Sequence, residues 1–312
     1  MKRFFAGTGK GLLAFLFFLG VQMIVSVVAV IVIMVLLAFS DPAIFTQGSA
    51  DAVSSELLKH VYGEMLPILL LSSLVTLATL SIICLAHRKN PLKEVGLRPV
   101  PVRTILPTIL IAVSANVFVG AFIALLPPEL LSSSEAEKVI EQAMLADPAR
   151  AFLFTLLAVV LAGPLTEEVV FRGLILSRFR RVMPAALAVL LSAFLFGFAH
   201  FNLLQSGYTF VLGVLFAILA LRCRSIVPTV VCHVVFNALG LFSGVFMLLS
   251  PAANAVIAIC AAAATGIGMI FLFRATETLA GDFVPEEPSV LPPRDFPPPA
   301  PAPVPLDLPS EI

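Results

Sequence analysis

The sequence predicts an all-α, polytopic membrane protein with about eight transmembrane helices. Of its 312 residues, 60% are hydrophobic and 12% are charged, and the mean hydropathy is +1.07. These values are far too apolar for a soluble domain of this length. Several apolar runs approach or exceed the roughly 20 residues that a helix needs to cross a bilayer. Lys and Arg gather in every second loop, which is typical of multi-pass membrane proteins.

The apolar runs define eight expected spans. The first run is longer than the roughly 7 to 15 residues of a signal-peptide core, so it is expected to stay as a span. In chain order, the spans cover residues 11–39, 65–86, 104–126, 151–176, 184–199, 208–221, 226–249 and 252–273. Basic residues precede the first span and follow the second, fourth, sixth and eighth. The positive-inside rule therefore predicts that both termini are cytoplasmic.

The chain is expected to divide into four parts. Residues 1–150 hold the first three spans and an outer loop, 151–249 hold spans four to seven as a catalytic core, and 250–281 hold span eight. In the outer loop, Ser134 and Glu137 fit a capping box before an amphipathic stretch, which predicts a short helix on the outer membrane surface or one packed on loops. Residues 282–312 are rich in Pro and are expected to form a disordered cytoplasmic tail.

Charged residues inside the fourth span, in the stretch GPLTEEVVFRG at 163–173, are functional candidates because ionisable groups are costly at membrane depth. Glu168 and Arg172 are four residues apart, so they share a helix face and are expected to form an ion pair. Glu167 is offset by about 100° round the helix. It therefore needs another partner or another task.

Polar side chains in spans five and seven complete a candidate site. His200 ends the run FLFGFAH, and His233 and Asn237 lie four residues apart in HVVFN, so the last two point the same way. Each alone could be a hydrogen bond between helices. Together with Glu167 they suit activation of a water and stabilisation of an oxyanion, binding of a divalent metal, or a proton relay in a transporter.

Other candidate nucleophiles have simpler explanations. The four cysteines have no CxxC spacing and are expected to be small apolar core residues. Ser243 in GLFSG lacks the spacing of a serine-protease motif and is expected to pack between helices. The sequence also has no HExxH or GxGD motif.

The three polar motifs resemble those of the CPBP family, named for CAAX proteases and bacteriocin-processing proteins, which includes the type II CAAX prenyl endopeptidase and Abi-like proteins. The resemblance is strongest over residues 150–245 and extends to flanking stretches such as GPLTEEVVFRGLIL, LFGFAHF and, before the third span, EVGLRP. The motifs occur in the family's order and are Glu167-Glu168-xxx-Arg172, Phe196-xxx-His200 and His233-xxx-Asn237.

The resemblance implies an intramembrane endopeptidase of the bacterial inner membrane. It assigns Glu167 and His200 to water activation, His233 and Asn237 to the oxyanion, and a supporting role to Glu168 and Arg172. A mechanism through a divalent metal such as zinc, bound by Glu167, His200 and His233, stays open. The side chains of Glu167 and His200 are expected within about 10 Å of each other, because two side chains that act on one substrate must both reach it.

The expected partners are a membrane-associated peptide or protein substrate and the lipid bilayer, with no nucleic acid. The rival interpretation is a non-enzymatic membrane module: a peptide-binding immunity factor, a scaffold or a proton-coupled transporter. A transporter would more typically show interrupted helices in both halves of the chain, whereas the polar cluster here lies in the second half only. That distribution favours the enzyme.

Overall fold

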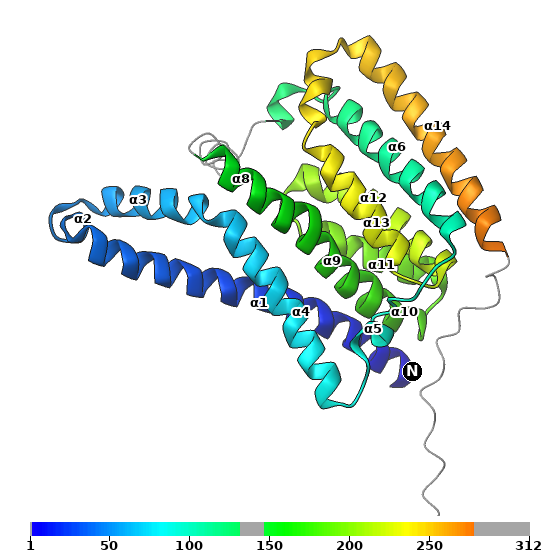
Figure 1. Ribbon diagram of the computed structural model, residues 1–312, viewed down its shortest axis with the longest axis horizontal. Helices are drawn as coiled ribbons and strands as arrows, with labels where there is room; N and C mark the ends of the chain where they lie inside the picture. Colours follow the sequence, from blue (N-terminus) through cyan, green and yellow to red (C-terminus); the bar gives the residue numbers. More distant parts are fainter. Residues whose placement is uncertain (1, 132–146, 278–312) are drawn as a thin grey trace, which may run out of the picture.

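The computed structural model describes residues 2–131 and 147–277, which are built from helices and connecting loops (Figure 1). These residues contain no strand, so the predicted all-α class is confirmed. The expected surface helix near Ser134 and the expected Pro-rich tail lie outside the described residues.

All eight predicted spans are helical. By length and composition, six helices could cross a membrane. They are α1 (Lys2–Ser40), α4 (Met65–Ala86), η1 (Val102–Thr104) with α6 (Ile105–Ile123), the continuous helix Pro148–Arg180, α12 (Leu203–Cys223) and α14 (Pro251–Thr276). The other two are α11 (Ala185–Phe198) and α13 (Val227–Gly240), each of 14 residues. The seventh span is shorter than predicted, because α13 ends at Gly240 and a 3-10 helix, η5 (Ser243–Leu248), follows.

Short helices complete the fold. They are α2 (Pro42–Gln47), α3 (Ala50–Gly63), α5 (Pro91–Glu94) and η2 (Pro128–Leu130). The hairpin of α1 to α4 extends away from the rest of the bundle, while α6 and α14 pack side by side on the opposite side (Figure 1). The helix Pro148–Arg180 lies between them, with α1 and α4 against one side and α11 and α13 against the other. It is therefore the central helix of the fold.

The central helix changes its winding around the GPLTEE stretch. It runs through α8 (Pro148–Phe154), η3 (Thr155–Ala162), α9 (Gly163–Glu168), η4 (Val169–Leu176) and α10 (Ser177–Arg180), where η3 and η4 are π-helical. Pro164 explains the first change, because a proline clashes with the carbonyl four residues earlier. The wider turn is seen in the Gly163 N–H, which donates to the Ala158 carbonyl. Such π-turns occur often at functional sites.

The loops rich in Lys and Arg gather at one end of the bundle. Gly7 near the N-terminus packs against Val182, which follows the central helix. Arg103, ahead of α6, donates from Nε to the Ala275 carbonyl near the end of α14, at 3.0 Å. Figure 1 shows the N-terminus, α5, α10 and the end of α14 on the same side of the molecule. The alternation of basic loops in the sequence therefore corresponds to a single basic end.

The loop at 95–98, in the stretch EVGLRP, connects the central helix to α13. The Val95 carbonyl packs so closely on Gly173 of η4 that a Cβ at Gly173 would lie 2.7 Å from its oxygen. On the other side of the loop, the Ser225 hydroxyl donates to the Arg98 carbonyl at 2.6 Å, just ahead of α13. This loop therefore fixes two site-bearing helices relative to each other.

We expect Gly173→Ala to destabilise the protein, because its Cβ would overlap a backbone carbonyl that cannot rotate away. Overpacking of this kind costs about 1–3 kcal/mol. Thermal unfolding of the purified protein in detergent measures the effect. Gly266→Ala in α14 is the control, because a Cβ there meets no atom within 4 Å. Equal melting temperatures for the two variants would contradict the expected close contact.

Candidate active site

Glu168 lies at the centre of a buried polar cluster. Its side chain is fully buried, and its Oε1 accepts hydrogen bonds from Arg172 Nη1 at 2.9 Å and from His233 Nδ1 at 3.0 Å. The ion pair predicted from the spacing of Glu168 and Arg172 is therefore present. The structure adds His233 of α13 as a third member.

Arg172 extends the cluster to two more helices. Its Nη2 donates to the Gly213 carbonyl of α12 at 3.3 Å. Its guanidinium lies over the rings of Phe196 in α11 and Phe216 in α12, with 4.3 and 5.2 Å to the ring centroids. A guanidinium over an aromatic face is favourable, more so where water is excluded. One buried cation therefore contacts α9, α11 and α12.

Glu167 faces the opposite nitrogen of the same histidine. Because His233 Nδ1 donates to Glu168, His233 Nε2 points elsewhere, and it lies 3.8 Å from Glu167 Oε2. This separation is too long for a direct hydrogen bond, but one water molecule can contact both atoms. The Glu167 side chain is 25% exposed, whereas that of Glu168 is fully buried. Neighbouring glutamates thus have different environments.

His200 is held by its own helix. Its Nδ1 donates to the Phe196 carbonyl at 2.8 Å, which leaves Nε2 as the nitrogen available to other groups. The imidazoles of His200 and His233 both contact the Phe196 ring edge-on, at centroid distances of 5.1 and 5.9 Å. No ion pair joins His200 to Glu167 in the described part of the chain. The expected proximity of those two side chains stays a prediction.

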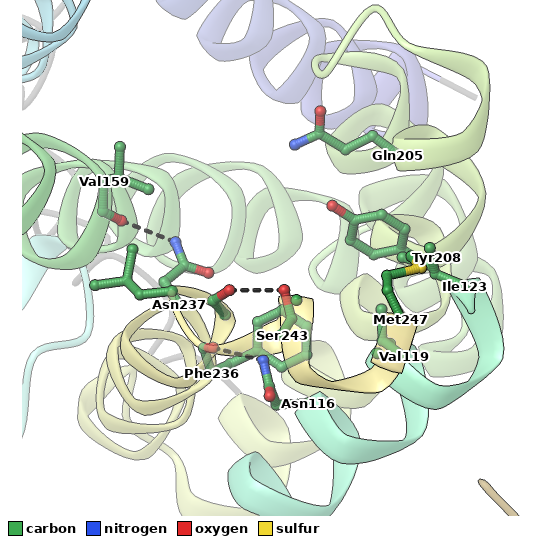
Figure 2. A pocket seen from close by; sticks show the side chains of 14 residues that line it. Asn116, Val119, Ile123, Val159, Gln205, Tyr208, Phe236, Asn237, Ser243 and Met247 are labelled. Atoms are coloured by element: carbon green, nitrogen blue, oxygen red, sulfur yellow. Dashed lines mark hydrogen bonds between the residues drawn. The ribbon is translucent and has the colours of Figure 1, made fainter. Parts of the chain in front are cut away.

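Asn237 faces the central helix, as does His233 one turn earlier. Its Nδ2 donates to the Val159 carbonyl of η3 at 2.8 Å. It also lines a cavity of about 380 Å³ between α6, α12, α13 and η5 (Figure 2). Across this cavity, Asn116 of α6 donates to the Phe236 carbonyl at 2.9 Å. The prediction that His233 and Asn237 point the same way therefore agrees with their contacts.

Several residues that shape the site were not singled out from the sequence. Phe196 was noted only as the first residue of its motif, although it lies between Arg172 and both histidines. Gly213 and Phe216 carry no ionisable group, and an apolar span gives no sign of their contacts. Asn116 could have been identified from the sequence, because a side-chain amide inside the third span is costly unless it is hydrogen-bonded.

The described residues do not form a metal-binding geometry. No three side chains among His, Cys, Asp and Glu are grouped so that they could hold a metal ion. The expected metal ligands were Glu167, His200 and His233. In the structure, His233 Nδ1 is hydrogen-bonded to Glu168, and His233 Nε2 faces Glu167. Ser243, for its part, donates to the Gly240 carbonyl at 2.8 Å, in agreement with the expected packing role (Figure 2).

We expect Arg172→Ala to destabilise the protein strongly, because it leaves the buried Glu168 carboxylate without its cation. Breaking a buried pair in this way costs about 3–5 kcal/mol. Thermal unfolding in detergent measures the loss, with Arg181→Ala, at an exposed position, as the control. The double variant Glu168→Met with Arg172→Met should recover part of the stability. A double variant less stable than Arg172→Ala would contradict this explanation.

Comparison with known proteins identifies the region that holds the cluster. No curated protein and no solved structure matches the chain. Residues 149–239 match the family model described as type II CAAX prenyl endopeptidase Rce1-like. This match covers the central helix, α11, α12 and nearly all of α13, and so every residue of the three motifs. The chain therefore contains an Rce1-like domain, and this match supports the resemblance of its three motifs to the CPBP family.

Proposed function

We propose that this protein is an intramembrane endopeptidase that hydrolyses a peptide bond of a membrane-associated peptide or protein. The observation that carries the proposal is the line of three side chains in which Glu168 orients His233 and His233 faces Glu167. A histidine held by one carboxylate and presented to another is suited to proton transfer at a bound water. The match of residues 149–239 to an endopeptidase family model supports the same reaction class.

Glu167 is the proposed general base. A water between Glu167 Oε2 and His233 Nε2 gives a proton to the carboxylate while its oxygen forms a bond to the scissile carbonyl carbon. The resulting tetrahedral intermediate collapses, the carbon–nitrogen bond breaks, and the proton passes from Glu167 to the leaving amine. The partial exposure of Glu167 supports this role, because a base must be reachable by water and substrate.

Asn237 and His200 are the residues proposed to contact the substrate, at or near the carbonyl that is attacked. One Nδ2 hydrogen of Asn237 is used by Val159, which fixes the amide and leaves the second hydrogen for a developing oxyanion. His200 keeps Nε2 available, because the Phe196 carbonyl holds its Nδ1. Glu168 and Arg172 act as positioning residues, since both are buried and Glu168 contacts the nitrogen of His233 that faces away from Glu167.

We further propose that the basic end of the bundle faces the cytoplasm, with both termini on that side. The gathered loops around Arg103, Val182 and Ala275 support this orientation, because basic loops are retained in the cytoplasm. The membrane is then the bacterial inner membrane, as the motif resemblance implies.

We expect Glu167→Gln to lower the cleavage rate strongly while leaving the fold intact. Removing a general base costs about 10²- to 10⁴-fold in rate, and Gln preserves the shape of a side chain that is only partly buried. The assay uses a library of membrane-tethered peptides with product detection by mass spectrometry, comparing wild type, Glu167→Gln and His200→Ala. Glu56→Gln on the distant α3 is the matched control. Equal activity of wild type and Glu167→Gln would favour the non-enzymatic membrane module.

A chelator added to the same assay separates the two mechanisms. Activity that needs Glu167 and persists in chelator supports the mechanism proposed here. Activity that is lost in chelator and restored by zinc would replace it with a metal-dependent one.

We expect Asn237→Ala and Asn237→Asp to lower kcat by about 10²- to 10³-fold, the typical effect of removing one oxyanion donor. The aspartate variant retains the side-chain shape but cannot donate from the same position when ionised. KM should change much less than kcat, because the interaction strengthens only in the transition state. Steady-state kinetics on one cleaved peptide measure both constants. An effect confined to KM would assign Asn237 to substrate binding instead.

A further inference from the structure

The cavity beside Asn237 begins where the proposed reaction site ends. Asn237 is four residues after His233 on α13, and the Val159 carbonyl that holds its amide belongs to another lining residue of the same cavity. From there the cavity extends between α12, α6 and η5 (Figure 2). If a substrate carbonyl binds at Asn237, the substrate residue next to that carbonyl therefore lies beside this cavity.

The lining is uncharged. None of its fourteen residues is Asp, Glu, Lys, Arg or His. Its polar members are amides and hydroxyls, such as Asn116, Gln205, Tyr208 and Ser243, and they alternate with apolar side chains such as Val119 and Met247. A charged group entering such a space would lose its hydration without gaining an ionic partner, which costs several kcal/mol. The lining therefore selects for an uncharged occupant.

The size of the cavity is set partly by glycines. Gly120 of α6 lies directly against the Phe246 ring, so that a Cβ at this position would overlap the ring. Gly240, the last residue of α13, also lines the cavity, and a Cβ there would lie 3.7 Å from Asn116 Nδ2 with no closer neighbour. The volume of about 380 Å³ falls within the range of roughly 300–1,000 Å³ that is typical of small-molecule sites. It is large enough for a bulky side chain and the backbone beside it.

We propose that this cavity is the specificity subsite of the enzyme and takes a large uncharged side chain next to the bond that is cleaved. The inference rests on the proposed function, because Asn237 joins the cavity to the reacting carbonyl. The walls from α6 and η5 lie outside residues 149–239, the part of the chain that matches the family model. The proposed selectivity therefore depends partly on residues outside the matched domain.

The test changes the cavity volume in both directions. Gly240→Leu fills the space next to Asn116, Met247→Ala enlarges it, and Gly266→Leu in α14 is the control for adding a leucine where no atom lies within 4 Å. The probes are membrane-tethered peptides that carry Ala, Leu, Phe or Glu at each position in turn. Cleavage is measured with these variants alone. Binding is measured with each variant combined with Glu167→Gln, so that the peptide stays whole.

We expect wild type to prefer Leu or Phe over Ala and Glu at one position beside the cleaved bond. Gly240→Leu should lower kcat/KM for the Leu and Phe peptides at least about tenfold, the usual scale for steric discrimination in an apolar pocket. It should leave the Ala peptide within about twofold. Met247→Ala should shift the preference from Leu towards Phe, and Gly266→Leu should retain the wild-type profile.

Two failures are distinguishable. If no peptide is cleaved in a Glu167-dependent manner, the proposed function fails, and the binding measurements still report on the cavity. If Gly240→Leu leaves the side-chain profile unchanged, or weakens all peptides equally in cleavage and in binding, the cavity is not the specificity subsite. A wild-type preference for the Glu peptide would overturn the inference as well.

Discussion

The structure depends on one constraint, the buried negative charge of Glu168. An isolated carboxylate in a low-dielectric interior is prohibitively costly, so it must have cationic or hydrogen-bonding partners. Arg172 and His233 both meet Oε1, and Arg172 is in turn held by the Gly213 carbonyl and two aromatic rings. Because these partners belong to the central helix, α11, α12 and α13, satisfying one charge fixes the relative positions of all four.

That constraint explains how two adjacent glutamates differ. Glu168 points into the bundle, where its partners neutralise it. Glu167 is turned about 100° round the helix and stays partly exposed, beside a histidine whose orientation Glu168 has already determined. The loop at 95–98 fixes the same pair of helices at the basic end, through Gly173 and Ser225. Contacts with other residues, above all the hydrogen bond between His233 and Glu168, therefore preorganise Glu167 and His233 relative to each other.

The sequence predicted what depends on local spacing. The apolar runs located all eight helices, and a separation of four residues identified the Glu168–Arg172 pair. It could not predict contacts that depend on helix packing: His233 reaches Glu168 across 65 residues, and Phe196 lies between two imidazoles. The early end of α13 was missed for a related reason, because residues 241–249 are apolar enough to continue a span. Composition alone does not distinguish that span from a helix followed by η5.

Stability alone does not require a buried ion pair at this position. Well-packed apolar residues of similar volume often replace a buried ion pair with no loss of stability, and nearby Phe196 and Phe216 already provide an apolar surface. Moreover, Glu168 Oε2 and Arg172 Nε are buried without a hydrogen-bond partner among the described residues, which adds to the cost. What the cluster does provide is a fixed orientation of His233, with one ring nitrogen held and the other facing Glu167. A site that must move a proton between those two groups needs that orientation, whereas a helix crossing does not.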